Sequence, residues 1–524
     1  MSKNIILLGG SNSVMVNGLS KGLKEGIEKL NASTGGGGLE FYNFALGGTS
    51  SIQRLYELRR NKAIIKNANL IICESNVNDI VASTLSEKES LPFNVLYRNA
   101  QWLYKELYAL NKKVLIIIFP TFNNRINNLH RLLCQKYNFN VIDMANYYEI
   151  NNLKDFEPDH LHPLSSYMKK LGESIIENIS IFKLGKTNTF VNDNPTFEII
   201  TPNQTQMISY KNITKKTFEN SLFKEEIFIL KKDGTMLKFK DYFDFKIIAI
   251  HFWNNDISGK DWYECSFRTS GVMIDNGIEH IIKDCGCFNS VQEIQNVNFK
   301  ITKNTCVRYC DKNIPRKEFH HSAAVWDNRN NIIDEIGIIA FFLASPKGNY
   351  HTETIDFQAL ENENIIISKD YDFSYLIPPV KFYKEIIDEY CCLMDNKKSA
   401  SFLKQIANLN HNLAKIKIHN HLSYKLGCIM IRNSKSLLGY IKMPFILMIV
   451  VLAHKEQNKT NHFLKELKND LNKEIILKEK ECFTYKLGAA LIKASKTWYK
   501  GGYIRFLFMD LPRLKKEFKN KKVK

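Results

Sequence analysis

Cysteine is scarce in this sequence, long apolar runs are few, and the N-terminus lacks the features of a secreted protein. The 11 cysteines among 524 residues are scattered and odd in number. They do not suggest a small disulfide-stapled fold, and they fit a reducing compartment. The first apolar run, Ile5–Leu8, is followed at once by glycines, whereas a signal peptide needs about 7–15 apolar residues. We therefore expect a cytoplasmic protein.

Four cysteines lie close enough in sequence to be weighed as a metal site. They are Cys285, Cys287, Cys306 and Cys310. Four thiolates can hold zinc, but these Cys-x-Cys and Cys-x3-Cys spacings differ from the usual Cys-x2-Cys pairs. The alternative is a group of packed thiols in a β-rich region. We predict no cofactor and no metal site, although the sequence alone does not decide this cluster.

The sequence also has fewer acidic than basic residues, and the imbalance is local. Lys and Arg number 73 against 54 Asp and Glu, a formal charge of +19. Residues 411–524 hold 25 of the basic and 8 of the acidic residues, a net of +17, so residues 1–410 carry only +2. The content of 44% hydrophobic and 12% aromatic residues excludes a wholly disordered or collagen-like chain. The charge indicates an anionic partner for the C-terminal part. We expect no nucleic acid, because no recognisable binding module accompanies the charge.

Residues 1–183 alternate apolar runs typical of buried parallel strands with amphipathic stretches typical of helices. The strands are predicted at Ile5–Leu8, Leu70–Cys73, Val114–Phe119 and Val141–Ile142. The helices are predicted at Val14–Leu30, Asn94–Leu110, Asn127–Tyr137 and Ser165–Ile181. This order predicts an α/β fold, a doubly wound sheet with helices on both faces, and ligands bind such sheets beyond the carboxyl ends of the strands.

Residues 184–376 change to short runs rich in Phe, Ile, Val and Thr, separated by Asn, Asp and Gly turns. The predicted strands are Thr196–Ile200, Ile227–Lys231, Lys246–Trp253, Ser266–Ile274, Asn298–Ile301, Ile338–Leu343 and Asn364–Ser368. Many short strands at this spacing predict a β-sandwich or jelly roll. Residues 377–524 then read as a basic helical region.

The helical region contains an internal repeat. The segment that begins Leu422-Ser-Tyr-Lys-Leu-Gly recurs as Phe483-Thr-Tyr-Lys-Leu-Gly, and each copy continues to a Gly-Tyr-Ile-Lys/Arg sequence. Two copies are too few for a solenoid, so we predict paired helical hairpins. Met443–Ala453 is apolar but short of the ~20 residues that span a bilayer.

The C-terminal end combines lysines with Leu514 and Phe518. This composition is typical of a helix that lies on an acidic membrane surface. A solvated basic tail on an ordinary helical bundle is the alternative. On the first interpretation, the protein is peripheral at the cytoplasmic face of the membrane.

Four segments that fall after strands, or before the last helix of residues 1–183, carry chemistry. Ser11 follows the first strand, and its hydroxyl is placed to face the crevice. Gly48 can offer a backbone N–H, and the Asn78 amide can donate to a developing oxyanion. His162 can take the serine proton, with Asp159 orienting the ring. Each segment is weak evidence alone, since a serine after a strand is usually a helix N-cap.

The ordered set of Gly9-Gly10-Ser11, Gly48, Asn78 and Asp159-x-x-His162 resembles the SGNH hydrolase superfamily, also called the GDSL esterases and lipases. The resemblance covers about residues 3–182 and implies a flavodoxin-like fold. It implies Ser11 as nucleophile, His162 as base and Asp159 as its partner. It also implies an oxyanion hole formed by the Ser11 N–H, Gly48 and Asn78.

Two positions depart from the family pattern. Gly10 stands where the family has Asp, and Asn76 stands where it has Gly. We expect the first to change the loop beside the catalytic atoms and the second to narrow the acyl pocket. His160 is a competing base, but only His162 has an aspartate three residues earlier.

The rest of the chain bears on the substrate. Aromatic residues of the β-rich part suit sugar rings, although packing in a core is the alternative; they are Trp253, Trp262, Trp326, Tyr263 and Tyr309. The helical tail looks similar to tails of bacterial enzymes that build capsule and lipooligosaccharide. That resemblance implies a sugar or surface-polysaccharide substrate and a donor of a small group.

Three hypotheses follow. The first is a transferase that places an O-acetyl or O-methyl phosphoramidate group on a surface glycan through a Ser11 intermediate. The second is a carbohydrate or lipid O-acyl esterase, and the third is a non-catalytic scaffold. The donor, the acceptor, the oligomeric state and glycan binding by the β-rich part are not decided by the sequence.

Overall fold

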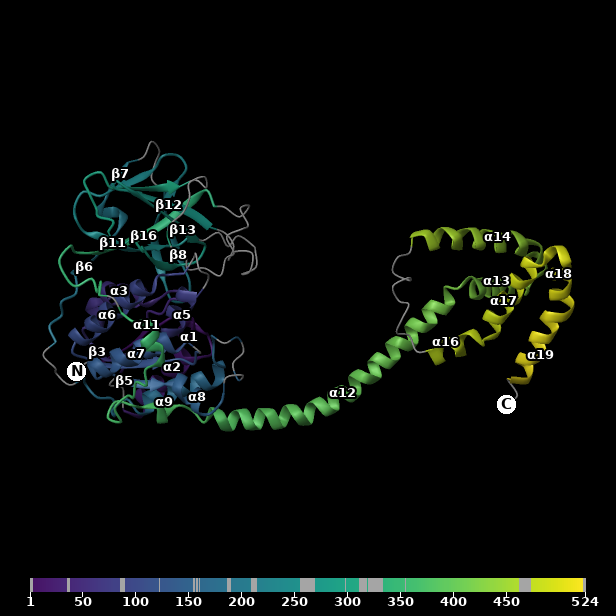
Figure 1. Ribbon diagram of the computed structural model, residues 1–524, viewed down its shortest axis with the longest axis horizontal. Helices are drawn as coiled ribbons and strands as arrows, with labels where there is room; N and C mark the ends of the chain where they lie inside the picture. Colours follow the sequence, from purple (N-terminus) through teal and green to yellow (C-terminus); the bar gives the residue numbers. More distant parts are fainter. Residues whose placement is uncertain are drawn as a thin grey trace. The chain divides into compact units, whose positions relative to one another are not determined.

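The fold is described from a computed structural model, and the chain divides into two compact units, Met1–Lys384 and Glu385–Lys524 (Figure 1). This division falls close to the predicted boundary after residue 376, whereas the predicted boundary after residue 183 lies inside the first unit. The structure describes residues 3–34, 38–84, 90–121, 123–153, 156, 159, 161–185, 190–208, 214–254, 269–296, 298–310, 318, 333–353, 355–460 and 473–521.

A five-stranded parallel sheet forms the centre of the N-terminal part. Its strands are β1 (Asn4–Leu8), β2 (Glu40–Asn43), β3 (Ala68–Cys73), β4 (Lys113–Ile118) and β5 (Asn140–Asp143). The spatial order is β2-β1-β3-β4-β5, and every neighbouring pair is parallel. This is the strand order of flavodoxin-like doubly wound sheets. The prediction of that sheet is confirmed.

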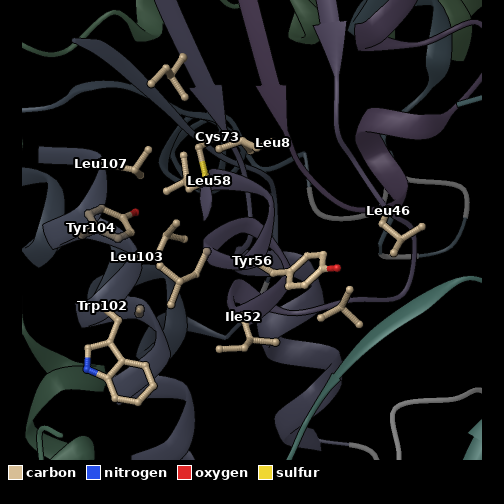
Figure 2. Close-up of a cluster of buried hydrophobic side chains, with 14 of the residues drawn as sticks. Leu8, Leu46, Ile52, Tyr56, Leu58, Cys73, Trp102, Leu103, Tyr104 and Leu107 are labelled. Atoms are coloured by element: carbon tan, nitrogen blue, oxygen red, sulfur yellow. The ribbon is translucent and has the colours of Figure 1, made fainter. Parts of the chain in front are cut away.

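Helices cover both faces of this sheet. The helices are α1 (Ser11–Val14), α2 (Leu19–Ser33), α3 (Ser51–Arg60), α4 (Lys62–Ile65), α5 (Asn76–Thr84), α6 (Phe93–Ala109), α7 (Asn124–Tyr137), α8 (Met144–Ile150) and α9 (Ser165–Glu177). Alternate residues of each strand enter opposite cores, so Ile6 and Leu8 pack with α3 and α6 while Ile5 and Leu7 pack with α2 and α9. Figure 2 shows the first of these cores, around Tyr56 and Leu103.

Two antiparallel sheets form the β-rich part, as predicted. The strands are β6 (Phe197–Ile200), β7 (Gln206–Ile208), β8 (Thr214–Glu219), β9 (Lys224–Lys231), β10 (Met236–Lys238), β11 (Lys246–Phe252), β12 (Thr269–Asp275), β13 (His280–Gly286), β14 (Ser290–Glu293), β15 (Cys306–Cys310) and β16 (Glu335–Ala344). The sheet orders are β13-β12-β15-β10-β7 and β14-β11-β16-β9-β8, with β6 added on β16. Side chains of both sheets share one core, which includes Val272 and Phe341, so the sheets form a sandwich.

Two of the predicted strands are wrong. Within Asn298–Ile301 only Lys300 forms a single bridge, and Asn364–Ser368 is not a strand. Its alternating isoleucines Ile365 and Ile367 instead pack against the core of the parallel-sheet domain. An extended segment that lies on a neighbour shows the same alternation as a strand, which explains the error.

The chain after β16 returns to the N-terminal domain. The Val141 N–H donates to the carbonyl of Tyr371, and the Phe373 N–H donates to the carbonyl of Val141, each at 2.8 Å. These bonds cover the outer edge of β5. The residues that follow, up to Val380, pack in the core between the sheet and helices α2 and α9. This segment also contains α11 (Phe357–Asn362) and η2 (Ser374–Leu376). Residues 357–380 therefore lie against the parallel-sheet domain, although the predicted β-rich domain extended to residue 376.

The sandwich packs firmly on helix α3. The hydroxyl of Tyr56 lies 3.0 Å from Nδ1 of His251, and the Arg60 guanidinium donates two hydrogen bonds to Glu225. Residues of β9, β11, β14 and β16 join the same core as α3 and α6. The two parts are therefore held by buried contacts as well as by the chain.

The second unit is helical. After α12 (Val380–His419), which begins in the first unit, it contains α13 (Leu422–Asn433), α14 (Leu437–Thr460), α16 (Lys473–Lys480), α17 (Phe483–Lys496), η3 (Trp498–Lys500), α18 (Gly502–Arg505), the π-helical turn η4 (Phe506–Asp510) and α19 (Leu511–Lys521).

The repeated helices α13 and α17 pack against each other at their glycines. A Cβ on Gly427 would lie 1.8 Å from the carbonyl oxygen of Thr484, and one on Gly488 would lie 1.7 Å from that of Ser423. Only glycine permits such an approach of two backbones. The two copies of the repeat therefore pair through their first helices, and the prediction of paired helical hairpins stays a prediction.

Candidate active site

The five predicted site residues lie where the doubly wound fold places ligands. Ser11 begins α1 directly after β1, and Gly48 lies in the turn before α3. Asn78 is in the first turn of α5 after β3, and Asp159 and His162 precede α9. Strands β1 and β3 are neighbours in the sheet. The carboxyl edge of the sheet therefore brings these separate segments together.

Three of these side chains form a hydrogen-bonded chain. Oγ of Ser11 lies 2.8 Å from Nε2 of His162, and Nδ1 of His162 lies 2.7 Å from Oδ2 of Asp159. Both distances are within hydrogen-bond range, so each ring nitrogen has one partner. A nucleophile, a base and an orienting carboxylate in this order can activate the serine hydroxyl.

The Asp159 carboxylate is fixed by the loop that carries it. The N–H groups of Leu161 and His162 donate to its Oδ1 at 3.0 and 2.8 Å. Partial burial raises the pKa of Asp159, but the hydrogen bonds from the His162 ring and from these two N–H groups outweigh it, so the pKa lies below its ordinary value. Asp159 therefore remains ionised at neutral pH and favours a proton on Nδ1 of His162.

The predicted oxyanion donors lie in the loops that meet Ser11 at the carboxyl edge of the sheet. Gly48 has φ of +68°, which glycine adopts without strain, and a Cβ on neighbouring Gly47 would lie 3.9 Å from Cα of Ser11. The Oδ1 atom of Asn78 accepts a hydrogen bond from Arg54 at 3.3 Å. Within the described part of the chain, Nδ2 of Asn78 donates no hydrogen bond, so this nitrogen is available to a substrate oxygen. The roles of Gly48 and Asn78 as oxyanion donors stay predictions.

Two buried charged residues that the sequence reasoning missed support these donors. Arg54 donates to the carbonyls of Thr49, Ser50 and Glu74 as well as to Asn78. It thereby joins the loop after Gly48 to the amide of Asn78. The signal in the sequence was an arginine within an otherwise buried helix, but burial of that position became evident only from the fold.

Glu74, the second missed residue, explains the departure at Gly10. Its carboxylate accepts hydrogen bonds from the Gly10 N–H and from Oγ of Ser13. A Cβ at position 10 would lie 1.8 Å from Oδ1 of Asn78, so a side chain there would require the Asn78 amide to move. The carboxylate of Glu74, the residue after β3, therefore lies against the loop that carries Ser11. This is the loop that we expected Gly10 to change.

The other departure, Asn76, does not act as predicted. Its amide donates to the carbonyl of Phe119 and to Oδ1 of Asn127, both at 2.9 Å, and its Oδ1 accepts from the Phe119 N–H. The side chain is 1% exposed. It holds the end of β4 in place instead of lining an open acyl pocket.

Other predicted positions have different outcomes. His160, Trp262, Tyr263 and Trp326 lie outside the described residues. Trp253 and Tyr309 are buried in the sandwich, and Trp253 packs edge-on against Phe218, so neither presents a face to a sugar. In the described part of the chain, no group of three His, Cys, Asp or Glu side chains is arranged to hold a metal ion.

The sandwich contacts the site through Glu293 of β14. Its carboxylate accepts hydrogen bonds from Oγ of Ser50 and from the amide of Asn99. Burial raises the pKa of Glu293 to about 7, and the nearby cations Lys283 and Arg98 offset only part of that effect. Glu293 is therefore hydrogen-bonded to Ser50, which follows Gly48 by two residues in the sequence.

Replacing Glu293 should change how stability depends on pH. A glutamate whose pKa rises from 4.5 to about 7 on folding stabilises the fold below about pH 4.5 and loses this contribution as the pH rises to about 7. Glu293→Gln cannot ionise. Its free energy of unfolding relative to the wild type should therefore rise by about 2–3 kcal/mol between about pH 5 and about pH 8.

Urea unfolding at the two pH values measures this difference. Glu226→Gln is the matched control, because Glu226 of β9 is exposed and its carboxylate stays in water in both states. A constant difference between the wild type and Glu293→Gln would contradict the prediction.

Comparisons with known proteins complete the description of the site. Residues 346–520 match a family described as a domain of unknown function (DUF8374). A search of curated proteins gave no match. Similar solved structures include a two-domain esterase active on acetylated mannans, crystallised with mannopentaose. It is 15% identical with a TM-score of 0.44, and the match covers 66% of this chain and 91% of that one.

Two further similar structures cover about a third of this chain. A variant of the acetyl xylan esterase Axe2 from Geobacillus stearothermophilus is 14% identical with a TM-score of 0.28, covering 35% of this chain and 97% of that one. A lipase/acylhydrolase from Enterococcus faecalis is 18% identical with a TM-score of 0.26, covering 35% and 100%. At these identities and TM-scores, the reaction of this chain is inferred from its own residues.

Proposed function

We propose that the first unit is a serine enzyme that acts on ester bonds through a covalent intermediate on Ser11. The observation that carries this proposal is the continuous chain from Ser11 Oγ to His162 at 2.8 Å and from His162 to Asp159 at 2.7 Å. A non-catalytic scaffold would not require these three side chains to meet. The assembled chain therefore favours an enzyme over the scaffold hypothesis.

The reaction follows from the positions of the donors and acceptors. His162 Nε2 takes the proton of Ser11 as Oγ attacks the ester carbonyl, and the carbonyl oxygen becomes an oxyanion. The N–H groups of Ser11 and Gly48 and the amide of Asn78 stabilise that charge. His162 then gives its proton to the departing alcohol, which leaves an acyl group on Ser11.

The proposed substrate class is an O-acylated carbohydrate. The His162 side chain is 28% exposed and that of Asp159 is 54% exposed, so the catalytic chain opens to solvent. An alcohol portion as large as a polysaccharide can approach such a site. Attack of water on the acyl-enzyme, with His162 again as base, releases the acid and completes an esterase cycle.

Transfer to a second sugar is the finer proposal. A sugar hydroxyl in place of water would receive the group from Ser11, whether this group is O-acetyl or O-methyl phosphoramidate. The observation that favours transfer to a capsular polysaccharide or lipooligosaccharide is the basic and apolar surface of the second unit. That surface suits an enzyme that works where membrane-linked glycans are assembled at the cytoplasmic face.

A fluorophosphonate probe tests the nucleophile and its base. The full-length protein should be labelled at Ser11, and His162→Ala should abolish the labelling because no base then accepts the serine proton. The adjacent variant His160→Ala should keep it. Labelling that persists in His162→Ala, or that maps to another serine, would refute the assignment.

Acetate release separates the two reactions. An esterase should release acetate from acetylated oligosaccharides at a rate that added deacetylated sugar does not raise. A transferase should show faster donor turnover with the right sugar and should form a new ester on it. Glycan mass spectrometry of a Ser11→Ala strain against its parent then identifies the transferred group by the missing mass.

A further inference from the structure

We propose that the second unit binds the surface of an anionic lipid bilayer by inserting two apolar segments, one from each copy of its repeat. The two segments are α14 and the stretch from η3 to η4, and the basic helix α19 follows the second. This inference concerns attachment and is independent of the reaction at Ser11.

The first segment is helix α14. Its outward face carries a row of exposed apolar side chains at spacings of three and four residues, which places them on one side of the helix. These side chains are Leu437, Ile441, Phe445, Met448 and Leu452. The opposite side, with Met443 and Leu447, is only half-buried. An apolar face of this size on a soluble protein marks an interaction site.

Helix α14 is also longer and more apolar than the sequence interpretation held. The stretch Leu437–Glu456 has 20 residues and a mean hydropathy of 2.0, and it is the one helix in the described part of the chain that is long and apolar enough to cross a membrane. The prediction based on Met443–Ala453 was too short because it stopped at the single charge of Lys442. The start of α14 packs on the end of α13, where Gly439 lies against the carbonyl oxygen of Asn433. A position parallel to the bilayer surface keeps this contact on the protein side of the headgroups.

The second segment repeats the same property. Its exposed side chains include Trp498, Tyr499, Ile504 and Phe508. Tyr503 and Ile504 stand in the repeat where the first copy has Tyr440 and Ile441, and all four are exposed. Tryptophan and tyrosine are enriched at the boundary between lipid and water. Two equivalent positions that both expose apolar side chains point to a shared role.

Charge identifies the occupant as an acidic bilayer. Helix α19 packs Leu511 and Leu514 inward, and Phe518 contacts Phe483 of α17. Its outward side carries exposed cations, namely Arg513, Lys515, Lys516 and Lys519. The net +17 of residues 411–524 is complementary to anionic headgroups, which attract each nearby lysine. A second copy of this chain would bring the same positive charge against itself.

Flotation of the full-length protein with vesicles tests the proposal. The protein should float with vesicles of phosphatidylcholine that contain phosphatidylglycerol, and binding should weaken with added salt. The double variant Lys515→Glu, Lys516→Glu should bind at least about 30-fold more weakly. The double variant Ile441→Ser, Phe445→Ser should bind about 100-fold more weakly or worse. Each substitution removes an apolar side chain that would insert into the bilayer.

Ile416→Ser is the matched control, because Ile416 is 52% exposed, comparable to the 64% of Ile441, but lies on α12 outside both segments. It should bind as the wild type does, and circular dichroism should show all variants folded. Ser11→Ala should also bind normally, so failure here is distinct from failure of the proposed reaction. If the double variant Ile441→Ser, Phe445→Ser binds vesicles as tightly as the wild type, the proposal is overturned. If the wild type does not bind vesicles but forms a dimer without lipid, and the double variant is monomeric, the surface instead binds a second copy of the chain.

Discussion

Ser11→Ala should lower kcat by about 10⁴–10⁶-fold toward its ester substrate, the loss seen when a nucleophile of this kind is removed from a serine enzyme. The reason is the 2.8 Å contact between Ser11 and His162, which alanine removes together with the covalent step. His162→Ala should lose about as much. The double variant should lose no more than either single variant, because the two groups act as one unit. Steady-state kinetics of the purified variants measures all three.

The control for this cycle is Ser33→Ala, which changes an exposed serine at the end of α2 and should retain full activity. Two results would contradict the role of Ser11. One is residual activity in Ser11→Ala within a few fold of the wild type. The other is losses that multiply in the double variant, which would mean that the two side chains act in separate steps.

Removing the Asn78 donor should lower kcat by about 10²–10³-fold with little change in KM, as expected for a group that acts on the oxyanion. Asn78→Ala removes two groups at once. One is Nδ2, the proposed donor to the oxyanion, and the other is Oδ1, which accepts the hydrogen bond from Arg54. Asn78→Asp is the sharper variant because it keeps an oxygen for Arg54 and replaces only the donor by an oxygen. A carboxylate would also repel the oxyanion, so Asn78→Asp should be at least as impaired as Asn78→Ala.

Kinetics together with thermal unfolding of both variants checks this assignment. The Asp variant should unfold within a few degrees of the wild type, because its contact with Arg54 is preserved. If Asn78→Asp hydrolyses esters nearly as fast as the wild type, Asn78 is not an oxyanion donor. If both variants lose activity only in proportion to their unfolded fraction, the residue is structural.

The meeting of Ser11, His162 and Asp159 could be predicted because each position depends on local order along the chain. Ser11 directly follows a short apolar strand, and Asp159 precedes His162 by three residues, so both relations are visible in the sequence. The fold then needed only parallel strands to bring these loops to one edge. The same logic placed Gly48 and Asn78 in the loops that follow β2 and β3.

The supporting residues could not be predicted, since their roles depend on contacts between distant segments. Glu293 comes from the sandwich, 243 residues from its partner Ser50. Arg54 looks like an ordinary surface arginine in the sequence, but it is fully buried, and its partners Thr49, Glu74 and Asn78 come from separate segments. The segment around Ile365 was predicted as a strand because its apolar residues alternate. An extended segment that packs one side on a neighbouring core shows the same alternation as a strand. Burial of charge and the choice of partner are properties of the assembled core.

The close contact of Gly427 with Gly488 has a consequence for the proposed attachment to a membrane. It fixes the two copies of the repeat to each other, so their apolar segments are tethered and each would raise the effective concentration of the other at the bilayer. Such avidity makes two modest attachments act as a strong one. Release then requires both segments to detach at once, so residence on the surface should depend steeply on the density of acidic lipid.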